Sequence, residues 1–134
     1  MAGGQERDPK GVLAIRTVAM PADANAAGDI FGGWVLAQMD IAGGVTAHQR
    51  ARGRVATVAV DAMTFHRPVM IGDLVELHAD IIRIGRTSIG VRVETWAVRA
   101  AGTARVLVTE GTFTYVALGP DRRPRPVDPP PVEA

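Results

Sequence analysis

The sequence predicts an α+β fold in which a curved, five-stranded antiparallel sheet wraps around one long central helix. The first observation is a single long helical segment, about residues 32–52, that is apolar on nearly all sides. The second is that the other apolar runs are β-branched and are separated by short breaker segments. Such a helix needs cover around most of its circumference, and one helix cannot cover both faces of a flat sheet. A sheet that curves around the helix satisfies both conditions.

The predicted strands follow one another along the chain, with the helix inserted after the first. Residues 11–20 form the first apolar run, which ends at Pro21, and a loop rich in turn formers leads to the helix at Gly32. Gly53 is expected to close the helix. Four further runs indicate strands: residues 54–65, 74–84, 88–99 and 103–118. Their short connections favour antiparallel neighbours.

The run 88–99 shows the clearest alternation of side chains. Its β-branched residues fall on one side of the strand, whereas Arg92, Glu94 and Trp96 fall on the other. This pattern is typical of a sheet with one covered face.

The chain is predicted to form one domain with two irregular ends. Its 134 residues fit a single domain, which we assign to residues 11–118. Residues 1–10 are polar and are expected to be flexible. Residues 119–134 hold most of the nine prolines, so this tail is predicted to be extended and disordered in part.

The composition excludes several classes of function. A hydrophobic content of 47% supports a packed core, and a net charge of +1 gives no broad attraction to nucleic acid or to a membrane surface. The absence of cysteine excludes a disulfide framework, a thiol nucleophile and a cysteine metal site. No apolar run approaches the roughly 20 residues of a membrane helix, and the first ten residues lack the apolar core of a signal peptide. We therefore expect a soluble, cytoplasmic protein that binds neither nucleic acid nor membrane.

One carboxylate, Asp40, lies in the middle of the apolar helix. At about 100° per residue it shares a stripe of small residues with Gly33, Gly43 and Gly44. A glycine inside a helix lowers helix stability by about 1 kcal/mol relative to alanine. The adjacent pair Gly43 and Gly44 therefore indicates that something near the helix requires small residues there. Small residues leave space for another backbone or for a ligand. The simpler alternative is that Asp40 accepts hydrogen bonds from a neighbouring element and serves packing alone.

The start of the helix offers a second polar feature. Free backbone N–H groups at Gly32 and Gly33, together with the positive end of the helix dipole, hold an oxygen that gains negative charge. A carboxylate in an apolar groove is a stronger base than one in water. A base and an oxyanion site on one helix suit hydrolysis of an acyl group. Thr57 and Thr64 are candidates to approach this site from the second strand, although the sequence does not show such contacts.

The stretch "MPADANAAGDIFGGWVLAQMDIAGG" closely resembles the signature of the YciA-type bacterial acyl-CoA thioesterases, which have the hotdog fold. Its most specific block consists of Asn25, Gly28, Phe31, Gly32 and Gly33, with Asp40 after it. The resemblance continues through "RPVMIGD", "IIRIGRTSIGVRVETWA" and "VTEGTFTYVAL", and it covers about residues 11–118. Close relatives often have a second asparagine where this chain has Ala27, which removes one amide from the loop.

The resemblance implies an acyl-CoA thioester hydrolase of fatty acid metabolism that needs no cofactor, because CoA is part of the substrate. It implies a homo-oligomer, at least a dimer and by analogy a trimer of dimers, with the active site at the dimer interface. Asp40 matches the catalytic aspartate and Asn25 the loop asparagine, contributed by different subunits. Gly32 and Gly33 match the helix start that polarises the thioester carbonyl.

The resemblance also implies a region that contacts CoA. This region consists of Arg83, Gly85, Arg86, Thr87 and Ser88. An arginine fork suits phosphate oxygens, although ordinary solvation of a turn explains the same residues. Arg122 and Arg123 in the tail are further candidates near the nucleotide.

Two other functions remain open from the sequence. A hotdog hydratase or dehydratase uses a histidine with a carboxylate, but no histidine stands at the helix start. His48, His66 and His78 are not spaced as metal ligands, so no metal site is predicted. The other alternative is a non-catalytic module that binds acyl-CoA.

Overall fold

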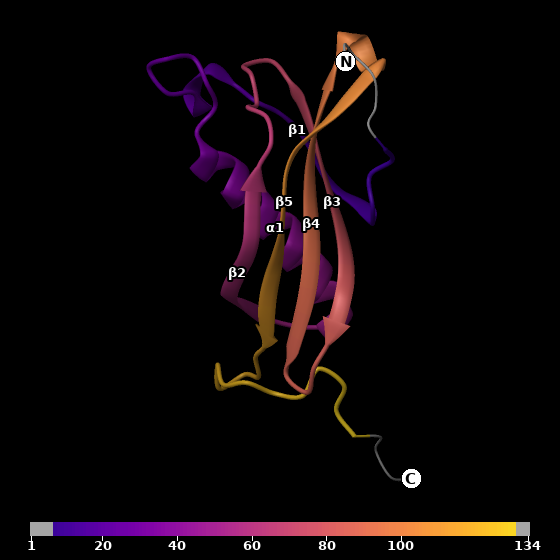
Figure 1. Ribbon diagram of the computed structural model, residues 1–134. Coiled ribbons are helices and arrows are strands. Elements are labelled where there is room, and N and C mark those ends of the chain that lie inside the picture. The colour runs from indigo at the N-terminus through magenta and orange to yellow at the C-terminus, as the bar shows by residue number, and fades with distance from the viewer. Residues whose placement is uncertain (1–6, 131–134) are drawn as a thin grey trace.

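The computed structural model describes residues 7–130 as one helix enclosed on one side by one sheet (Figure 1). The elements in chain order are β1 (Val12–Val18), the 3-10 turn η1 (Pro21–Asp23), α1 (Gly32–Ala51), β2 (Val55–Phe65), β3 (Leu74–Ile84), β4 (Ser88–Arg99), the 3-10 turn η2 (Ala100–Gly102) and β5 (Ala104–Ala117). The predicted strands and helix are confirmed, with ends that differ by at most a few residues. No helix in residues 7–130 has the length and apolarity that crossing a bilayer requires.

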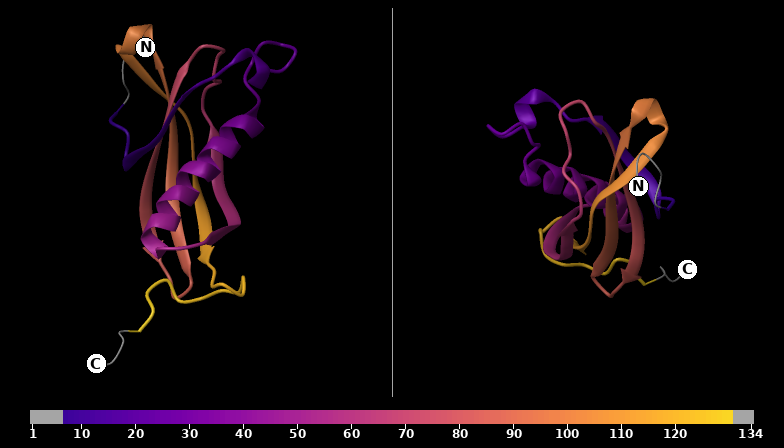
Figure 2. Two further views of the ribbon diagram at one scale, coloured as in Figure 1. Left: turned by 180° about the vertical axis from the view of Figure 1, so that it is seen from behind. Right: turned by 45° about the horizontal axis from the view of Figure 1, so that its top comes forward.

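The five strands form one antiparallel sheet in the order β1-β3-β4-β5-β2. The hairpins β3–β4 and β4–β5 follow the predicted rule that short connections join neighbours. The connection between β2 and β3, residues 66–73, does not, because β2 lies at the far edge of the sheet beside β5. Figure 2 shows the sheet curving around α1, as the predicted hotdog fold requires.

The helix buries one side against the sheet and leaves the other side open. The buried side chains of α1 are Val35, Met39, Ala42, Ala47 and Ala51. The other side of the helix exposes Leu36, Ile41 and Val45, with Ile41 at 52%. The sheet of one chain therefore covers only one side of α1 and leaves apolar side chains on the other side exposed.

The outer face of the sheet differs from the sequence expectation, because both faces of β4 are covered. Glu94 is 1% exposed and Trp96 is 0% exposed. Arg7 donates two hydrogen bonds to Glu94, at 3.1 and 2.7 Å, and its guanidinium lies 5.2 Å from the centroid of the Trp96 ring. The backbone N–H of Lys10 donates to Glu94 at 3.0 Å. Residues 7–10 therefore lie on the sheet, whereas the rest of the predicted flexible N-terminus lies outside the described residues.

The proline-rich segment follows an extended path and contacts the domain as far as Asp128, which forms an ion pair with Arg50. Arg125 donates from its guanidinium to the carbonyl oxygens of Ala51 at 2.7 Å and of Leu118 at 3.2 Å. Val127 is buried, and its N–H donates to the carbonyl of Arg86 at 2.9 Å. The segment thus joins the end of α1 to the β3–β4 turn.

Candidate active site

Asp40 lies halfway along α1 on the side that faces β2 and β5, and its side chain is half-buried. Thr57 in β2 donates from Oγ1 to Oδ1 of Asp40 at 2.7 Å. Tyr115 in β5 brings its hydroxyl to 3.1 Å from the same Oδ1 and to 2.9 Å from the Asp40 carbonyl oxygen. Among the described residues, no donor bonds Oδ2. Thr57 is therefore the donor to Oδ1, and the single hydroxyl proton of Tyr115 is shared between Oδ1 and the nearer carbonyl oxygen of Asp40.

The two hydroxyls come from residues that face each other directly across β2 and β5. Thr57 pairs with Tyr115, and the strand register shifts between Thr57 and Ala59. An irregularity of this kind re-aims side chains and recurs next to active sites. Thr64, the other threonine considered from the sequence, instead accepts a hydrogen bond at its carbonyl oxygen from Thr109 at 2.5 Å.

The glycines of α1 make room for the ring of Tyr115. A Cβ atom at Gly43 would overlap the Tyr115 hydroxyl and would come within 3.0 Å of Cζ. At Gly44 the nearest ring atom is Cε1 at 3.6 Å, an ordinary contact. The close approach of Tyr115 therefore explains why position 43 is a glycine, whereas a side-chain methyl at position 44 would make only an ordinary contact with the ring.

Tyr115 is the site residue that sequence reasoning missed. It is 1% exposed, and burial, followed by the charge and hydrogen bond of Asp40, raises the pKa of its hydroxyl above the ordinary tyrosine value. The hydroxyl therefore keeps its proton and remains a donor. Two signals were present: it is the one tyrosine in the sequence, and a buried tyrosine hydroxyl needs a partner.

The start of α1 has two backbone N–H groups without acceptors among the described residues. The N–H groups of Trp34 and Val35 both donate to the Phe31 carbonyl, at 3.0 and 3.3 Å, and no side chain caps the helix. The N–H groups of Gly32 and Gly33 are left over. A Cβ at Gly33 would meet no atom of residues 7–130 within 4 Å. At Gly32 the nearest side-chain atom to a Cβ would be Cζ of Phe65 at 3.7 Å, so the helix start has open space at Gly33 and an aromatic ring beside Gly32.

Asn25 shapes the loop that leads to this helix start. Its Oδ1 accepts hydrogen bonds from the N–H of Ala27 at 2.9 Å and of Asp29 at 3.1 Å. The carbonyl oxygen of Asn25 accepts from Gly28 at 3.0 Å, and Gly28 has a φ of +92°, which favours glycine. The Oδ1 atom is thus used to hold the loop, and Nδ2 has no acceptor among the described residues.

The structure does not bring the predicted catalytic residues together within one chain. Gly33 and Asp40 are seven residues apart on one straight helix, about 10 Å along its axis. A carbonyl group bound at Gly33 would therefore be out of reach of the carboxylate of the same chain. Asp40 lies instead beside Thr57 of β2, the strand at the free edge of the sheet.

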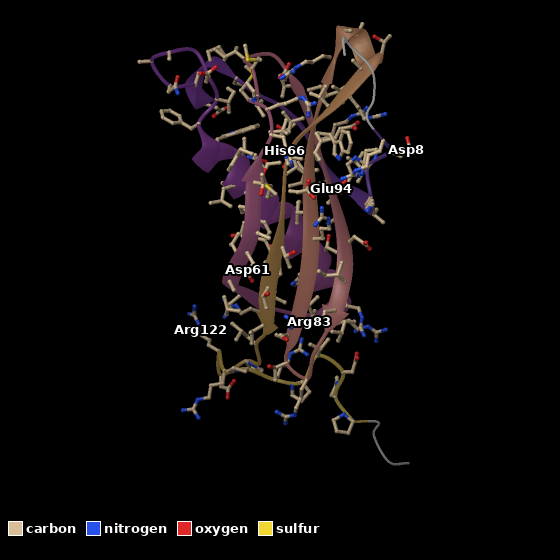
Figure 3. The ribbon with its side chains drawn as sticks, in the orientation of Figure 1. Asp8, Asp61, His66, Arg83, Glu94 and Arg122 are labelled. Carbon is tan, nitrogen blue, oxygen red and sulfur yellow. The ribbon has the colours of Figure 1, made fainter. Side chains whose placement is uncertain are left out.

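The predicted CoA-contacting residues form the β3–β4 turn at the opposite end of the domain from the Asn25 loop (Figures 1 and 3). The N–H of Gly85 donates to the carbonyl of Ser88 at 2.8 Å. A Cβ at Gly85 would come within 2.7 Å of the Ser88 hydroxyl oxygen. The side chains of Arg83 and Arg86 are exposed.

Further arginines gather at the same end of the molecule. Figure 3 shows Arg122 and Arg83 at this end. An open pocket of about 1040 Å³ lies nearby, and its basic residues are Arg50, Arg52, Arg54 and Arg125. Arg50 forms an ion pair with Asp128 in the tail, at 2.8 Å. This end of the domain therefore carries a concentration of positive charge suited to anions.

The histidines serve other contacts. His66 bonds Glu110 at 3.0 Å, His78 lies 3.7 Å from Glu76, and His48 is exposed near the end of α1. In residues 7–130, no histidine bonds Asp40 and no cluster of three or more histidine or carboxylate groups has the arrangement that holds a metal ion.

The comparisons with known proteins agree with the geometry. The family model of the thioesterase superfamily matches residues 27–112. The acyl-CoA thioester hydrolase YciA of Salmonella typhimurium is 49% identical over 125 residues, which cover 91% of this chain and 94% of the relative. The YciA protein of Escherichia coli K12 is 48% identical over 120 residues, covering 87% and 91%.

Solved structures show the same fold. The hexameric thioesterase y2039 from Yersinia pestis superposes with a TM-score of 0.86 at 48% identity, covering 91% of this chain and 99% of that one. HI0827, described as a hexameric, broad-specificity acyl-coenzyme A thioesterase, superposes with a TM-score of 0.87 at 43% identity, covering 94% and 88%. The predicted resemblance is confirmed: this chain belongs to the thioesterase superfamily and, within it, to the YciA type of acyl-CoA thioester hydrolase.

Proposed function

We propose that this acyl-CoA thioesterase hydrolyses its substrate to a free carboxylic acid and CoA with Asp40 as general base or nucleophile. The observation that carries the proposal is the asymmetric setting of Asp40. Its Oδ1 accepts the Thr57 hydroxyl and shares the Tyr115 hydroxyl with the Asp40 carbonyl oxygen, while Oδ2 has no donor among the described residues. A half-buried carboxylate in an apolar helix, with one oxygen bonded by a neighbouring strand, suits a group that accepts a proton or attacks a carbonyl carbon.

The chemistry follows from the polar groups available. The thioester carbonyl oxygen binds at the free N–H groups of Gly32 and Gly33, where the helix dipole stabilises the developing negative charge. Asp40 removes a proton from water as the water oxygen attacks the carbonyl carbon, or it attacks that carbon itself to form a mixed anhydride that water then hydrolyses. The C–S bond then breaks, and the thiolate leaves and takes up a proton. A thiolate is a good leaving group, so no strong general acid is required, and the reaction needs no cofactor.

The site is proposed to form between two subunits. The separation of about 10 Å between Gly33 and Asp40 on one helix supports this arrangement. So does the edge strand β2, which has no further strand beside it within residues 7–130 and exposes Val58 at 58% and Phe65 at 52%. An exposed apolar edge of this kind is normally covered. A second copy paired at β2 would bring its Asn25 loop and helix start towards Asp40.

Three expectations from the sequence extend this proposal. Assembly into a hexamer, as a trimer of dimers, is supported by the relatives y2039 and HI0827, both described as hexameric. The cytoplasmic location and a role in fatty acid metabolism stay predictions.

CoA is proposed to bind at the β3–β4 turn. Arg83 and Arg86 would meet its phosphates, with Gly85, Thr87 and Ser88 shaping the turn between them. The neighbouring arginine-lined pocket supports an anion at this end of the domain. Arg122 and Arg123 remain candidates for the same nucleotide.

The alternatives are less well supported. Hydration or dehydration needs an acid and base pair, and no histidine in residues 7–130 bonds Asp40. A non-catalytic acyl-CoA binding module would not need a carboxylate oxygen left free.

The activity is tested by thiol release from acyl-CoAs of short to long chain. We expect turnover of several members of the panel, and binding without turnover of any thioester would favour the non-catalytic module. A single turnover in ¹⁸O-labelled water separates the two roles of Asp40, because the label enters its side chain only if it acts as nucleophile.

The two-subunit site is tested by mixing two inactive variants. If Asp40 and Asn25 belong to different subunits, a mixed dimer of Asp40→Asn and Asn25→Ala chains contains one intact site. Remixing the two proteins after dissociation should then restore activity. No recovery in demonstrably mixed dimers would mean that both residues act from the same chain.

A further inference from the structure

We infer that Val127 in the proline-rich tail is a positioning residue that fixes Arg86 of the β3–β4 turn for binding the nucleotide end of CoA. The inference rests on the proposed function, which puts CoA at this turn, and deepens it by naming what holds the turn. The observations that carry it are a backbone hydrogen bond, a buried side chain and two anchors of the tail on α1, all in described residues.

The first step is that the backbone of the β3–β4 turn is held although Arg86 exposes its side chain. The carbonyl oxygen of Arg86 accepts a hydrogen bond from the N–H of Val127 at 2.9 Å. The carbonyl oxygen of Thr87 accepts from the N–H of Ala117, at the end of β5, at 2.8 Å. Two carbonyl oxygens of the turn therefore receive donors from outside the β3–β4 hairpin. The backbone of Arg86 is fixed, while its guanidinium remains available to a ligand.

The second step is that the tail has the sequence of an edge segment with donors on one side only. The stretch "PRPV", residues 124–127, alternates proline with a residue that has an N–H group. The N–H of Arg125 donates to the carbonyl oxygen of Ala117 at 2.9 Å, and the N–H of Val127 donates to the turn. The two prolines, which lack a donor, occupy the alternate positions. Their fixed φ angles also reduce the entropy that the tail loses when it docks.

The third step is that the tail is anchored on both sides of Val127. Arg125 donates from its guanidinium to the carbonyl oxygen of Ala51, the last residue of α1, at 2.7 Å. Asp128 accepts two hydrogen bonds from Arg50, at 2.8 and 2.9 Å. Val127 itself is 3% exposed and belongs to the apolar core. The turn is therefore tied through Val127 to the end of the helix.

The fourth step connects this arrangement to the ligand. The tail also lines the open, arginine-lined pocket of about 1040 Å³, so it borders the space where an anion would lie. A mobile side chain must be ordered when it binds a ligand, and this ordering weakens binding by roughly 3- to 10-fold for each side chain. A turn whose backbone is already fixed avoids part of that loss. Arg86 is therefore prepared to meet a phosphate of CoA because Val127 holds its carbonyl group.

The test measures the dissociation constant of CoA by calorimetry in the full chain, with kcat and KM for one acyl-CoA and for the matching acyl-pantetheine. Val127→Ala removes the buried anchor without changing the charge. It should weaken CoA binding and raise KM for acyl-CoA about 3- to 10-fold, because the turn is no longer held. We expect kcat to stay within about twofold of wild type and KM for acyl-pantetheine to be unchanged.

Val75→Ala is the matched control for a loss of packing. It truncates another buried valine of the apolar core, near the start of β3 and therefore at the far end of that strand from the turn. It should lower the melting temperature and leave the dissociation constant of CoA as in wild type.

A second background tests whether Val127 acts through Arg86. The Arg86→Ala protein has no arginine left to position at this site. Adding Val127→Ala to it should therefore change the dissociation constant of CoA by less than about twofold. If the effects of the two substitutions multiply instead, the tail acts independently of Arg86 and the inference is wrong.

The remaining outcomes separate this inference from the proposed function. If wild type hydrolyses acyl-CoA and Val127→Ala binds CoA as tightly as wild type, the positioning role is wrong and the proposed function stands. The role is equally overturned if Val75→Ala weakens CoA binding as much, or if KM for acyl-pantetheine rises in parallel. If wild type binds CoA but hydrolyses no thioester, the proposed function fails and the dissociation constants still decide the inference. If wild type binds no CoA, both fail.

Discussion

Gly43 in α1 lies so close to Tyr115 in β5 that a Cβ atom at this position would overlap the tyrosine hydroxyl. This contact explains why a glycine stands in the middle of a helix next to a carboxylate. The same hydroxyl reaches Oδ1 of Asp40 at 3.1 Å. Packing of the helix on the sheet and orientation of the carboxylate therefore depend on one side chain.

Gly43→Ala should destabilise the protein, whereas Gly44→Ala should not. The new methyl at position 43 must displace a buried, stiff ring, which should lower the free energy of unfolding by about 1–3 kcal/mol. The better helix propensity of alanine offsets about 1 kcal/mol of this loss. At position 44 the methyl meets Tyr115 at an ordinary 3.6 Å, so the propensity gain of up to about 1 kcal/mol remains. Urea unfolding of both variants measures the difference, and equal stabilities would contradict the packing account.

Arg83→Ala and Arg86→Ala should raise KM for acyl-CoA and leave kcat nearly unchanged. Each removes a charge placed to meet a phosphate rather than the reacting carbonyl, so the loss belongs to substrate binding. An acyl-pantetheine with the same acyl group but no nucleotide is the matched substrate. Its KM should be the same for wild type and variants, and a parallel rise for both substrates would mean that the turn acts on the acyl group or on folding.

The stability of the protein should fall in acid as Glu94 is protonated. Burial acts to raise the pKa of Glu94, but hydrogen bonds from Arg7, the Lys10 N–H and Trp96 outweigh it and lower this pKa to about 2, from an ordinary 4.5. Because the folded-state pKa lies below the unfolded one, the stabilisation is fully present above pH 4.5 and is lost progressively towards pH 2.

The Arg7→Ala variant gives the control for this acid effect. This substitution leaves the buried Glu94 with fewer hydrogen-bond donors and should lower the free energy of unfolding by about 1–3 kcal/mol at pH 7. Its unfolding free energy should then vary less between pH 5 and pH 3 than that of wild type. An identical pH dependence in both proteins would show that other carboxylates cause the acid loss.

Arg125→Ala should lower the melting temperature by freeing the end of α1. The guanidinium donates to the carbonyl oxygens of Ala51, Leu118 and Pro126, the first of which belongs to the last turn of the helix. Loss of these hydrogen bonds should lower the free energy of unfolding by about 1–3 kcal/mol. Arg123→Ala removes an exposed arginine from the same segment and should melt like wild type. Equal melting of all three proteins would mean that the segment contributes nothing to stability.

The fold was largely predictable because its signals are local. The β-branched runs predicted β3 and β4 to the residue, and the apolar pattern predicted α1 to within one residue. The position of β2 beside β5 was not predictable from connection length, because it depends on which edge of the curved sheet remains open.

The site was predictable only where a residue could be recognised by its own neighbours in sequence. Asp40 stood out as a carboxylate in an apolar helix. Tyr115 lies 75 positions away and looked like an ordinary strand residue, because its role comes from tertiary contact alone. Trp96 and Glu94 were assigned to an open face for the same reason, since the segment that covers them is distant in sequence.

The most direct test of the account is the turnover of Asp40→Asn beside wild type on the same acyl-CoA panel, with melting curves of both. Asparagine keeps the shape and an acceptor for Thr57 and Tyr115 but is neither a base nor a nucleophile. The account predicts a loss of kcat of at least about 1000-fold with an equal or higher melting temperature. Asp40→Asn that keeps wild-type turnover, or that loses turnover only because it unfolds, would contradict it.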